Sequence, residues 1–416
     1  MKLSDFGCCA FSCCATVAIL AGCGGGSGTP LSPSTAGLTA ERRHARPAYS
    51  VLYSFKGYSD DGALPVAALI NVNGTLYGTT SNGGANGLGT VFAITSGKET
   101  VLHSFGAQGD GALPHASLIN VKGTLYGTTF EGGANCSASG GCGTVFKITT
   151  SGAETVLHSF GKKRDGGYAG AGLINVKGTL YGTTIGGGAT GYGTVFAITT
   201  SGKETVLHSF GVGSLDGVFP AGLINVKGTL YGTTYEGGAS YGTVFSITTS
   251  GTATVLYSFA GGSGDGAFPN AGLLDVKGTL YGTTTYGGTG SCLDGRGSGC
   301  GTVFSITTSG TETVLYSFQG GSGDGKDPGA ALLNVKGSLY GTTGSGGGDR
   351  CAKHQGCGTV FAITTSGAET VLYSFKGGSG DGKDPLAGLI NVNDMLYGTT
   401  RVGGAYGYGT VFSLSP

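Results

Sequence analysis

A repeating set of short motifs is clearest in Val371-Leu-Tyr-Ser-Phe375, Gly380-Asp-Gly382, Leu389-Ile-Asn-Val392, Leu396-Tyr-Gly-Thr-Thr400 and Gly409-Thr-Val-Phe412. A block of roughly fifty residues with these landmarks recurs from Val51 to the end of the chain, and its period is that of one propeller blade. The array opens with Val51-Leu-Tyr-Ser-Phe55. Every Gly-Thr-Val-Phe segment is followed by such a segment except the last, Gly409-Thr-Val-Phe412. This displacement predicts a closed ring.

Each copy contains four short segments rich in β-branched and aromatic residues, which predicts four strands. In the third copy they are residues 171–176, 179–184, 194–199 and 205–210. Lys177-Gly178 and Thr200-Ser-Gly-Lys203 join them in pairs, as tight hairpin turns do. The expected unit is a four-stranded antiparallel meander.

Apolar side chains occur on both faces of these strands, so both faces of each sheet must be covered. The blades of a propeller meet that condition because each sheet packs between two others. A parallel β-solenoid is the main rival, but its coils are shorter and need no pair of tight hairpins. We therefore predict an all-β, seven-bladed propeller over residues 50–416, closed by strand 51–55 pairing with the last blade.

The composition limits the partners. Only 11% of the 416 residues are charged and the formal net charge is zero, so no basic surface is expected to attract nucleic acid. Glycine contributes 89 residues without the three-residue period of collagen. The repeated apolar positions predict a folded body in place of a disordered one. We expect it to be a monomer.

The N-terminal 23 residues have the character of an export signal. An apolar run from Phe6 to Leu20 leads into Leu20-Ala-Gly-Cys23, which resembles the lipobox of bacterial lipoproteins and implies cleavage after residue 22 and lipidation of Cys23. An ordinary secretory signal is the alternative. Residues 23–49, rich in glycine, serine and proline at their start, are then expected to form a flexible tether. The predicted location is the cell envelope, in the outer membrane if the organism has one, and secretion otherwise.

Six further cysteines lie in pairs within three variable loops. An even number of cysteines in an exported protein predicts local disulfides. Zinc is disfavoured because two ligands in one loop cannot complete its four-coordinate shell. The expected pairs are Cys136 with Cys142, Cys292 with Cys300, and Cys351 with Cys357.

The repeated Leu-Tyr-Gly-Thr-Thr, Gly-Gly, Gly-Thr-Val-Phe and Leu-Tyr-Ser-Phe or Leu-His-Ser-Phe segments resemble the GloVer-type tandem repeat of exported bacterial "choice-of-anchor" proteins. The likeness covers the chain from Val51 onward. It implies a propeller-like body, with the lipobox as the anchor in this chain. It supplies no catalytic motif.

Two features that recur among the copies raise the question of metal binding. One Asp-Gly pair per copy could bind calcium through its carboxylate, but a turn in which the aspartate caps its own backbone is favoured. His103, His158 and His208 replace a tyrosine of other copies. Equivalent positions of adjacent packed sheets lie about 10 Å apart, too far for one shared ion, so packing with the polar edge toward solvent is expected. We predict no cofactor.

The loops between the second and third strands vary in length, and variable loops on a rigid scaffold commonly carry binding sites. Residues there that break the repeat are the candidates for a ligand-binding rim. They are Phe130, Glu131, Tyr192, Tyr235, Glu236, Tyr286, Asp294, Arg296, Asp349, Arg350, Lys353, His354, Arg401, Tyr406 and Tyr408.

No phosphate loop, nucleophile elbow or metal-helix motif occurs in the sequence. We therefore expect a non-catalytic binding module for a glycan, an envelope polymer or a protein. The alternative is an exported polysaccharide hydrolase or lyase that uses carboxylates such as Glu131, Glu236 or Asp294. Glycoside hydrolysis requires two carboxyl groups about 5 to 10 Å apart, and sequence alone does not give that distance.

Overall fold

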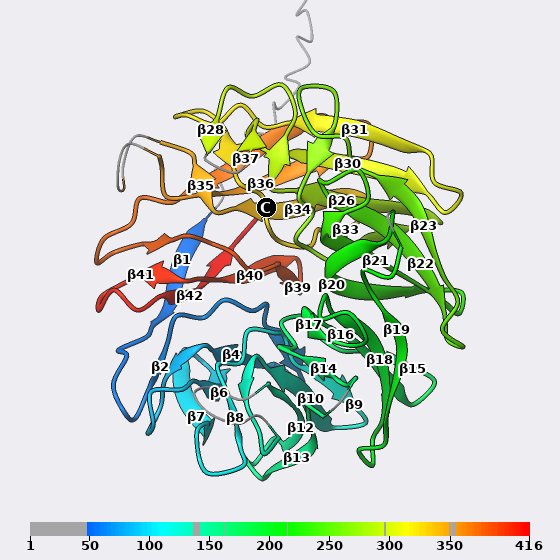
Figure 1. The fold of residues 1–416 in the computed structure, drawn as a ribbon. Helices are drawn as coiled ribbons and strands as arrows, with labels where there is room; N and C mark the ends of the chain where they lie inside the picture. The colour runs from blue at the N-terminus through cyan, green and yellow to red at the C-terminus, as the bar shows by residue number, and fades with distance from the viewer. Residues whose placement is uncertain are drawn as a thin grey trace, which may run out of the picture. The chain divides into compact units, whose positions relative to one another are not determined.

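A computed structural model describes residues 48–135, 142–162, 164–213, 215–294, 297–348, 351 and 355–416. The described chain is all-β and forms the predicted seven-bladed propeller of four-stranded antiparallel sheets (Figure 1). Residues 46–416 make one compact unit. None of the described residues forms a helix long and apolar enough to cross a membrane.

Blades 1 to 3 follow one another along the chain, each numbered from its innermost strand outward. Blade 1 consists of β3 (Ile70–Val72), β4 (Thr75–Thr80), β6 (Thr90–Thr95) and β7 (Lys98–Ser104). Blade 2 consists of β9 (Ile119–Val121), β10 (Thr124–Thr129), β12 (Thr144–Thr149) and β13 (Glu154–Ser159). Blade 3 consists of β15 (Ile174–Val176), β16 (Thr179–Thr184), β18 (Thr194–Thr199) and β19 (Glu204–Ser209).

Blades 4 to 6 repeat this order. Blade 4 consists of β20 (Gly217–Val226), β21 (Thr229–Gly237), β22 (Thr243–Thr248) and β23 (Ala253–Ser258). Blade 5 consists of β25 (Leu274–Val276), β26 (Thr279–Thr284), β30 (Thr302–Thr307) and β31 (Glu312–Ser317). Blade 6 consists of β33 (Leu333–Val335), β34 (Ser338–Thr343), β36 (Thr359–Thr364) and β37 (Glu369–Ser374).

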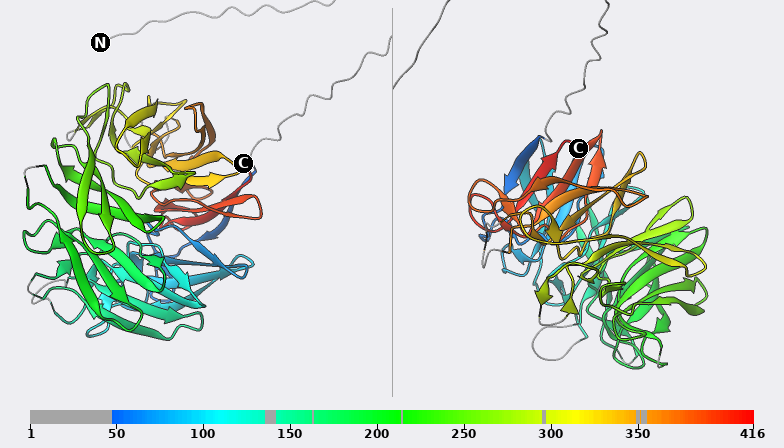
Figure 2. Two further views of the ribbon diagram at one scale, coloured as in Figure 1. Left: turned by 90° about the vertical axis from the view of Figure 1, so that its right-hand side faces the viewer. Right: turned by 90° about the horizontal axis from the view of Figure 1, so that it is seen from above.

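Blade 7 is built from both ends of the chain. Its strands are β39 (Ile390–Val392), β40 (Met395–Thr400), β42 (Thr410–Leu414) and β1 (Tyr49–Ser54). In Figures 1 and 2 the blue β1 lies beside the red strands of this blade. The predicted closure is confirmed, although β1 begins at Tyr49, two residues before the expected start. Tyr49 is held there because its ring stacks on Tyr373 at a centroid distance of 4.0 Å.

The innermost strands are shorter than predicted. Residues 171–173 were expected to begin a strand, but β15 starts at Ile174. The residues before Ile174 form no strand pairing with β16 and instead line the cavity at the centre of the ring. Blade 4 differs, since one residue fewer separates Asp216 from Leu223 than separates the equivalent residues of other blades. There β20 pairs with β21 from Gly217 onward, with a register shift between Pro220 and Leu223.

In the six blades other than blade 4, a two-residue ladder pairs the Asp-Gly connection with the Gly-Gly segment of the same blade. In blade 1, β2 (Gly62–Ala63) pairs with β5 (Asn82–Gly83). The equivalents are β8 (Gly111–Ala112) with β11 (Glu131–Gly132), β14 (Gly166–Gly167) with β17 (Gly186–Gly187), β24 (Gly266–Ala267) with β27 (Tyr286–Gly287), β32 (Gly325–Lys326) with β35 (Ser345–Gly346), and β38 (Gly382–Lys383) with β41 (Val402–Gly403). A separate hairpin of β28 (Leu293–Asp294) and β29 (Gly297–Ser298) lies in a variable loop.

The hydrophobic core is divided among the interfaces between neighbouring blades. In the first of these clusters Phe105 of blade 1 meets Phe146 of blade 2 edge to face at 5.1 Å. Equivalent phenylalanine pairs occur at all seven interfaces, including Phe55 with Phe92 where the ring closes. Both faces of each sheet are therefore buried, as the apolar pattern predicted.

The glycine of each Leu-Tyr-Gly-Thr-Thr segment makes room for this packing. A Cβ on Gly127 would lie 2.6 Å from Phe146 and 2.8 Å from Leu118, closer than any side chain tolerates. The predicted tight turns between the first two strands are also confirmed. Asn73 and Gly74 both have positive φ, as do Lys122 and Gly123, which is the backbone of a type I′ hairpin.

Candidate functional site

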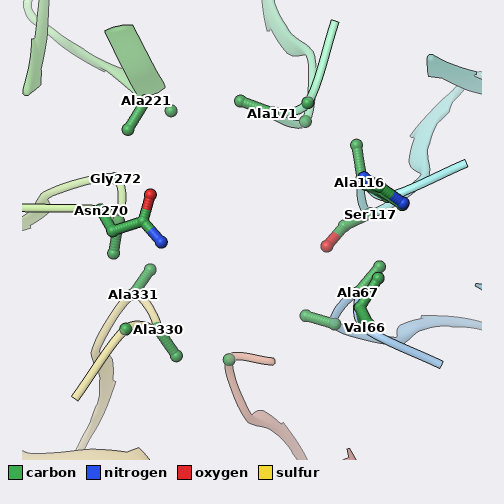
Figure 3. Close-up of a pocket in the computed structure, with 18 of the residues that line it drawn as sticks. Val66, Ala67, Ala116, Ser117, Ala171, Ala221, Asn270, Gly272, Ala330 and Ala331 are labelled. Carbon is green, nitrogen blue, oxygen red and sulfur yellow. The ribbon is translucent and has the colours of Figure 1, made fainter. Parts of the chain in front are cut away.

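A central cavity of about 850 Å³ opens at the face that carries the variable loops. It is lined by the short segments that precede the innermost strands, one from each blade. Figure 3 shows small side chains of these segments, among them Ala67, Ala116, Ala171, Ala221 and Ala330, arranged around an open centre. Alanine and glycine at these positions leave the space that larger residues would fill.

Hydrogen bonds between blades hold this lining in place. The first threonine of each Tyr-Gly-Thr-Thr segment donates its hydroxyl to the lining alanine of the next blade, as Thr183 does to the Ala221 carbonyl at 2.9 Å. The same bond recurs at every interface and closes the ring from Thr399 to Ala67 at 3.2 Å. The walls of the cavity are thus part of the rigid scaffold.

Near the start of each lining segment, one residue has a left-handed backbone conformation. These residues are Leu64, Leu113, Tyr168, Phe219, Phe268, Asp327 and Asp384, with φ between 52° and 61°. Such a conformation costs about 1 to 3 kcal/mol for a non-glycine residue. Two backbone bonds offset it: Phe268, for example, donates to Tyr241 and accepts from Thr285. Of these side chains, Phe219 lines the cavity, while Tyr168 and Phe268 contact the lining residues Phe130 and Tyr235.

On one side, the mouth is bordered by aromatic rings. Phe130 stacks on His115 with ring centroids 4.9 Å apart and lies 5.3 Å from Tyr168. Phe268 contacts Tyr235 at 5.1 Å. Blades 2 to 5 supply this aromatic arc, which we define as His115, Phe130, Tyr168, Phe219, Tyr235 and Phe268. Burial lowers the pKa of His115, so this ring is neutral at neutral pH.

Blades 6 and 7 have charged residues at the corresponding positions. Asp327 and Asp384 occupy the left-handed position, and Arg401 follows the Tyr-Gly-Thr-Thr segment. The Arg401 guanidinium donates to the Asp384 carboxylate at 2.9 Å. The mouth is therefore asymmetric, with an aromatic and a charged side, although the scaffold beneath it repeats.

The structure brings three of the predicted rim residues to the cavity: Phe130, Tyr235 and Glu236. The others whose side chains are described do not line it. Tyr192 packs on Phe219 at 5.9 Å, Tyr286 lies 5.8 Å from Phe268, and Tyr406 and Tyr408 are exposed. Glu131 belongs to β11 and Arg401 to the charged side.

Several predicted residues lie outside what the structure describes. They are Cys23, Cys136, Arg296, Asp349, Arg350, Lys353 and His354, and the side chain of Asp294. The predicted disulfides Cys292–Cys300 and Cys351–Cys357 are confirmed, with Cα–Cα distances of 5.0 and 5.6 Å. Cys142 is also disulfide-bonded.

The sequence interpretation of the Leu-His-Ser-Phe histidines was wrong in one respect. Their polar edges do not face solvent: Nε2 of His103 lies 3.0 Å from the Asp110 carboxylate, and that of His158 lies 3.0 Å from Asp165. Tyrosines at this position do the same, as Tyr53 donates to Asp61 at 2.9 Å. The aspartates are those of the Asp-Gly turns, and each also caps the following glycine, as expected.

A glutamate of the next blade approaches most of these pairs. Burial, then the charge of Asp61, raises the pKa of Glu99 to about 8. Burial likewise raises the pKa of Glu312 to about 7, with the charge of Asp265 as the second cause. These carboxyl groups are therefore held in surroundings that favour the neutral acid.

Sequence reasoning missed His115, Tyr168, Phe219 and Phe268 as parts of the mouth. The signal was present, because these residues differ between copies in a segment whose other residues repeat. The segment runs from an Asp-Gly turn to an inner strand, where variation is not by itself a sign of a binding site.

A family model, the Gloeobacter/Verrucomicrobia repeat, matches residues 32–240, 134–352 and 290–416. The chain belongs to this repeat family, which confirms the resemblance of its motifs. No curated protein matches the chain.

Three solved structures illustrate the similarity of fold. PorZ, a bacterial surface component of the type-IX secretion system of Porphyromonas gingivalis, is 14% identical with a TM-score of 0.50, over 87% of this chain and 48% of PorZ. The computationally designed Ika8 protein is 14% identical with a TM-score of 0.45, over 86% and 99% of the two chains. A puromycin-hydrolyzing peptidase of Mycobacterium tuberculosis is 10% identical with a TM-score of 0.47, over 80% and 48%.

Proposed function

We propose that this propeller is a non-catalytic binding module that takes a glycan into the mouth of its central cavity. The observation that carries the proposal is the aromatic arc beside a cavity of about 850 Å³, a volume within the usual range for ligand sites. Aromatic rings bury the apolar faces of a sugar, while a few polar groups fix its orientation. Glu236 and the exposed Asn270 supply such groups at the same mouth.

The carboxylates favour binding over hydrolysis. Glycoside hydrolysis uses two carboxyl groups about 5 to 10 Å apart. Among the described residues that line the cavity, Glu236 is the one carboxylate. If a bound oligosaccharide were nevertheless cleaved, release of reducing ends that Glu236→Gln abolishes would replace this proposal by the hydrolase alternative.

The test begins with a glycan array and continues with titration calorimetry on the ligands found. Tyr235→Ala and Phe130→Ala are expected to weaken binding about 3- to 10-fold, since an aromatic contact contributes about 0.5 to 1.5 kcal/mol. Tyr406→Ala is the matched control, because that exposed tyrosine lies away from the cavity lining. Equal losses in all three variants, or no glycan bound, would contradict the proposal.

We further propose that the module is exported and held at the cell envelope by a lipid on Cys23. The support is the apolar run and the Leu20-Ala-Gly-Cys23 motif, together with paired cysteines that form disulfides. Incorporation of a labelled fatty acid that Cys23→Ser abolishes is the expected result. Labelling that survives this change would disprove Cys23 as the anchor.

A further inference from the structure

Two interfaces between blades bring together three different metal-ligating groups. At the first, His103 and Asp110 of the blade 1 region meet Glu154, which begins β13 of blade 2. At the second, His158 and Asp165 meet Glu204, which begins β19 of blade 3. In each set the ligand atoms all lie within 4.8 Å of one another.

The geometry within each set suits a small divalent ion. Zinc binds histidine nitrogen and carboxylate oxygen at about 2.0 to 2.2 Å, so two atoms bound to one tetrahedral ion are about 3.3 Å apart. The imidazole and aspartate atoms are 3.0 Å apart at both interfaces. The glutamate oxygen lies within 4.8 Å of both other ligand atoms, so it must move closer when an ion is bound.

The surroundings fix the aspartate ligand and leave the glutamate ligand without a hydrogen-bond partner. Oδ1 of Asp110 accepts the Gly111 N–H at 2.6 Å, which fixes the orientation of the carboxylate, as outer contacts do in metal sites. Oε1 of Glu154 and Oε1 of Glu204 are buried and have no hydrogen-bond partner among the described residues. The histidine side chains are 22% and 14% exposed, so an ion can enter from solvent.

We propose that each of these two His–Asp–Glu sets binds one Zn²⁺ ion and thereby links neighbouring blades. Three protein ligands and one water complete the four-coordinate shell. The inference differs from a single ion shared by several histidines, which the separation of equivalent blade positions rules out. It is independent of the cavity at the mouth.

The chain contains its own controls. At the third histidine interface, His208 and Asp216 are 3.4 Å apart, and Ala253 begins the strand that carries a glutamate elsewhere. At other interfaces a tyrosine replaces the histidine, as in the pair Tyr257 and Asp265. Tyrosine is therefore a substitution that this scaffold already accommodates.

The experiment measures Zn²⁺ stoichiometry by calorimetry and elemental analysis. All proteins are full-length chains in which Cys8, Cys9, Cys13, Cys14 and Cys23 are serine, so that these thiols bind no metal. The parent is expected to bind two ions, His103→Tyr and His158→Tyr one each, and the double variant none. Ala253→Glu should add a third.

Thermal melting with and without Zn²⁺ completes the test. Zn²⁺ should raise the melting temperature of the parent, less for the single variants, and leave the double variant unchanged. Circular dichroism confirms that the tyrosine variants fold. Unchanged stoichiometry in the double variant, or no Zn²⁺ bound by the folded parent, would overturn the proposal, and a silent Ala253→Glu would show that these three groups do not suffice.

Discussion

The interfaces between blades and the mouth of the cavity obey opposite rules. At the interfaces the same tyrosine, glycine, threonine and phenylalanine recur in every blade, because the same packing problem is solved seven times. At the mouth the corresponding positions carry phenylalanine in one blade and aspartate in another. Repetition therefore marks the scaffold, whereas departure from it marks the surface available for recognition.

Removal of β1 should have the largest effect, because it opens the ring. Deletion of residues 49–54 leaves the edge of β42 without its partner and exposes the aromatic cluster around Phe375 and Phe412. Exposed edges pair with other chains, so we expect a sharply lower melting temperature or aggregation. An unchanged melting curve and a monomeric gel-filtration profile would refute a closed ring.

Two glycine substitutions compare an interface with the mouth directly. Gly127→Ala places a Cβ against Phe146 and Leu118, and overpacking of this kind costs about 1 to 3 kcal/mol. Gly329→Ala adds the same methyl group to the cavity lining, where no described heavy atom lies within 4 Å of it. Its free energy of unfolding should change by less than about 0.5 kcal/mol. Equal losses of unfolding free energy for Gly127→Ala and Gly329→Ala in denaturant melts would contradict a difference in packing between interface and mouth.

The half-buried glutamates of the interfaces predict a dependence on pH. The pKa of Glu99 is raised to about 8, so the native state binds its proton more tightly than the unfolded chain does. The contribution of Glu99 to stability is therefore complete below about pH 4.5 and is lost as the pH rises through about 8.

Glu99→Gln keeps the neutral shape and removes this titration. In EDTA, the melting temperature of the variant should fall less between pH 5 and 9 than that of the parent. Glu312→Gln is the paired variant, whose effect should end near pH 7 because the pKa of Glu312 is raised only to about 7. Parallel curves for the parent and Glu99→Gln would contradict the assignment.

The sequence predicted the scaffold well and the site only in part. Hairpins, blades and closure follow from local patterns that recur in register, so each copy checks the others. Phe130, Tyr235 and Glu236 were found because they interrupt a repeated segment beside a loop. Phe219 and Phe268 were missed because their place at the mouth depends on a left-handed backbone. The sequence does not predict that conformation for a residue that precedes a proline.

The same limit applies to the Asp-Gly turns. The turn itself follows from a residue pair, and the cap on the next glycine was expected. Its contact with a tyrosine or histidine depends on how the connection folds back, and the approach of Glu154 depends on the neighbouring blade. Contacts between blades are set by the closed ring, and no single copy of the repeat contains that information.

The smallest expected effect concerns two threonine hydroxyls that differ in whether they have a partner. Thr183 donates to the Ala221 carbonyl of the next blade, so Thr183→Val, which keeps the shape and removes the donor, should cost about 0.5 to 1.5 kcal/mol. Thr285 follows the Tyr-Gly-Thr-Thr segment of blade 5, and its Oγ1 is buried with no hydrogen-bond partner among the described residues.

Thr285→Val should therefore be neutral or slightly stabilising, because it removes a buried hydroxyl that gives up hydrogen bonds to water on folding without forming one to a described residue. In denaturant melts, the free energy of unfolding should then fall for Thr183→Val and stay constant or rise for Thr285→Val, although the chemical change is identical. Such a result would place the hydroxyl of Thr183 in the ring scaffold and that of Thr285 outside it. If both substitutions cost the same, the hydrogen bond between blades adds no stability, and the repeated threonine must be explained by packing against the second threonine and its glycine instead.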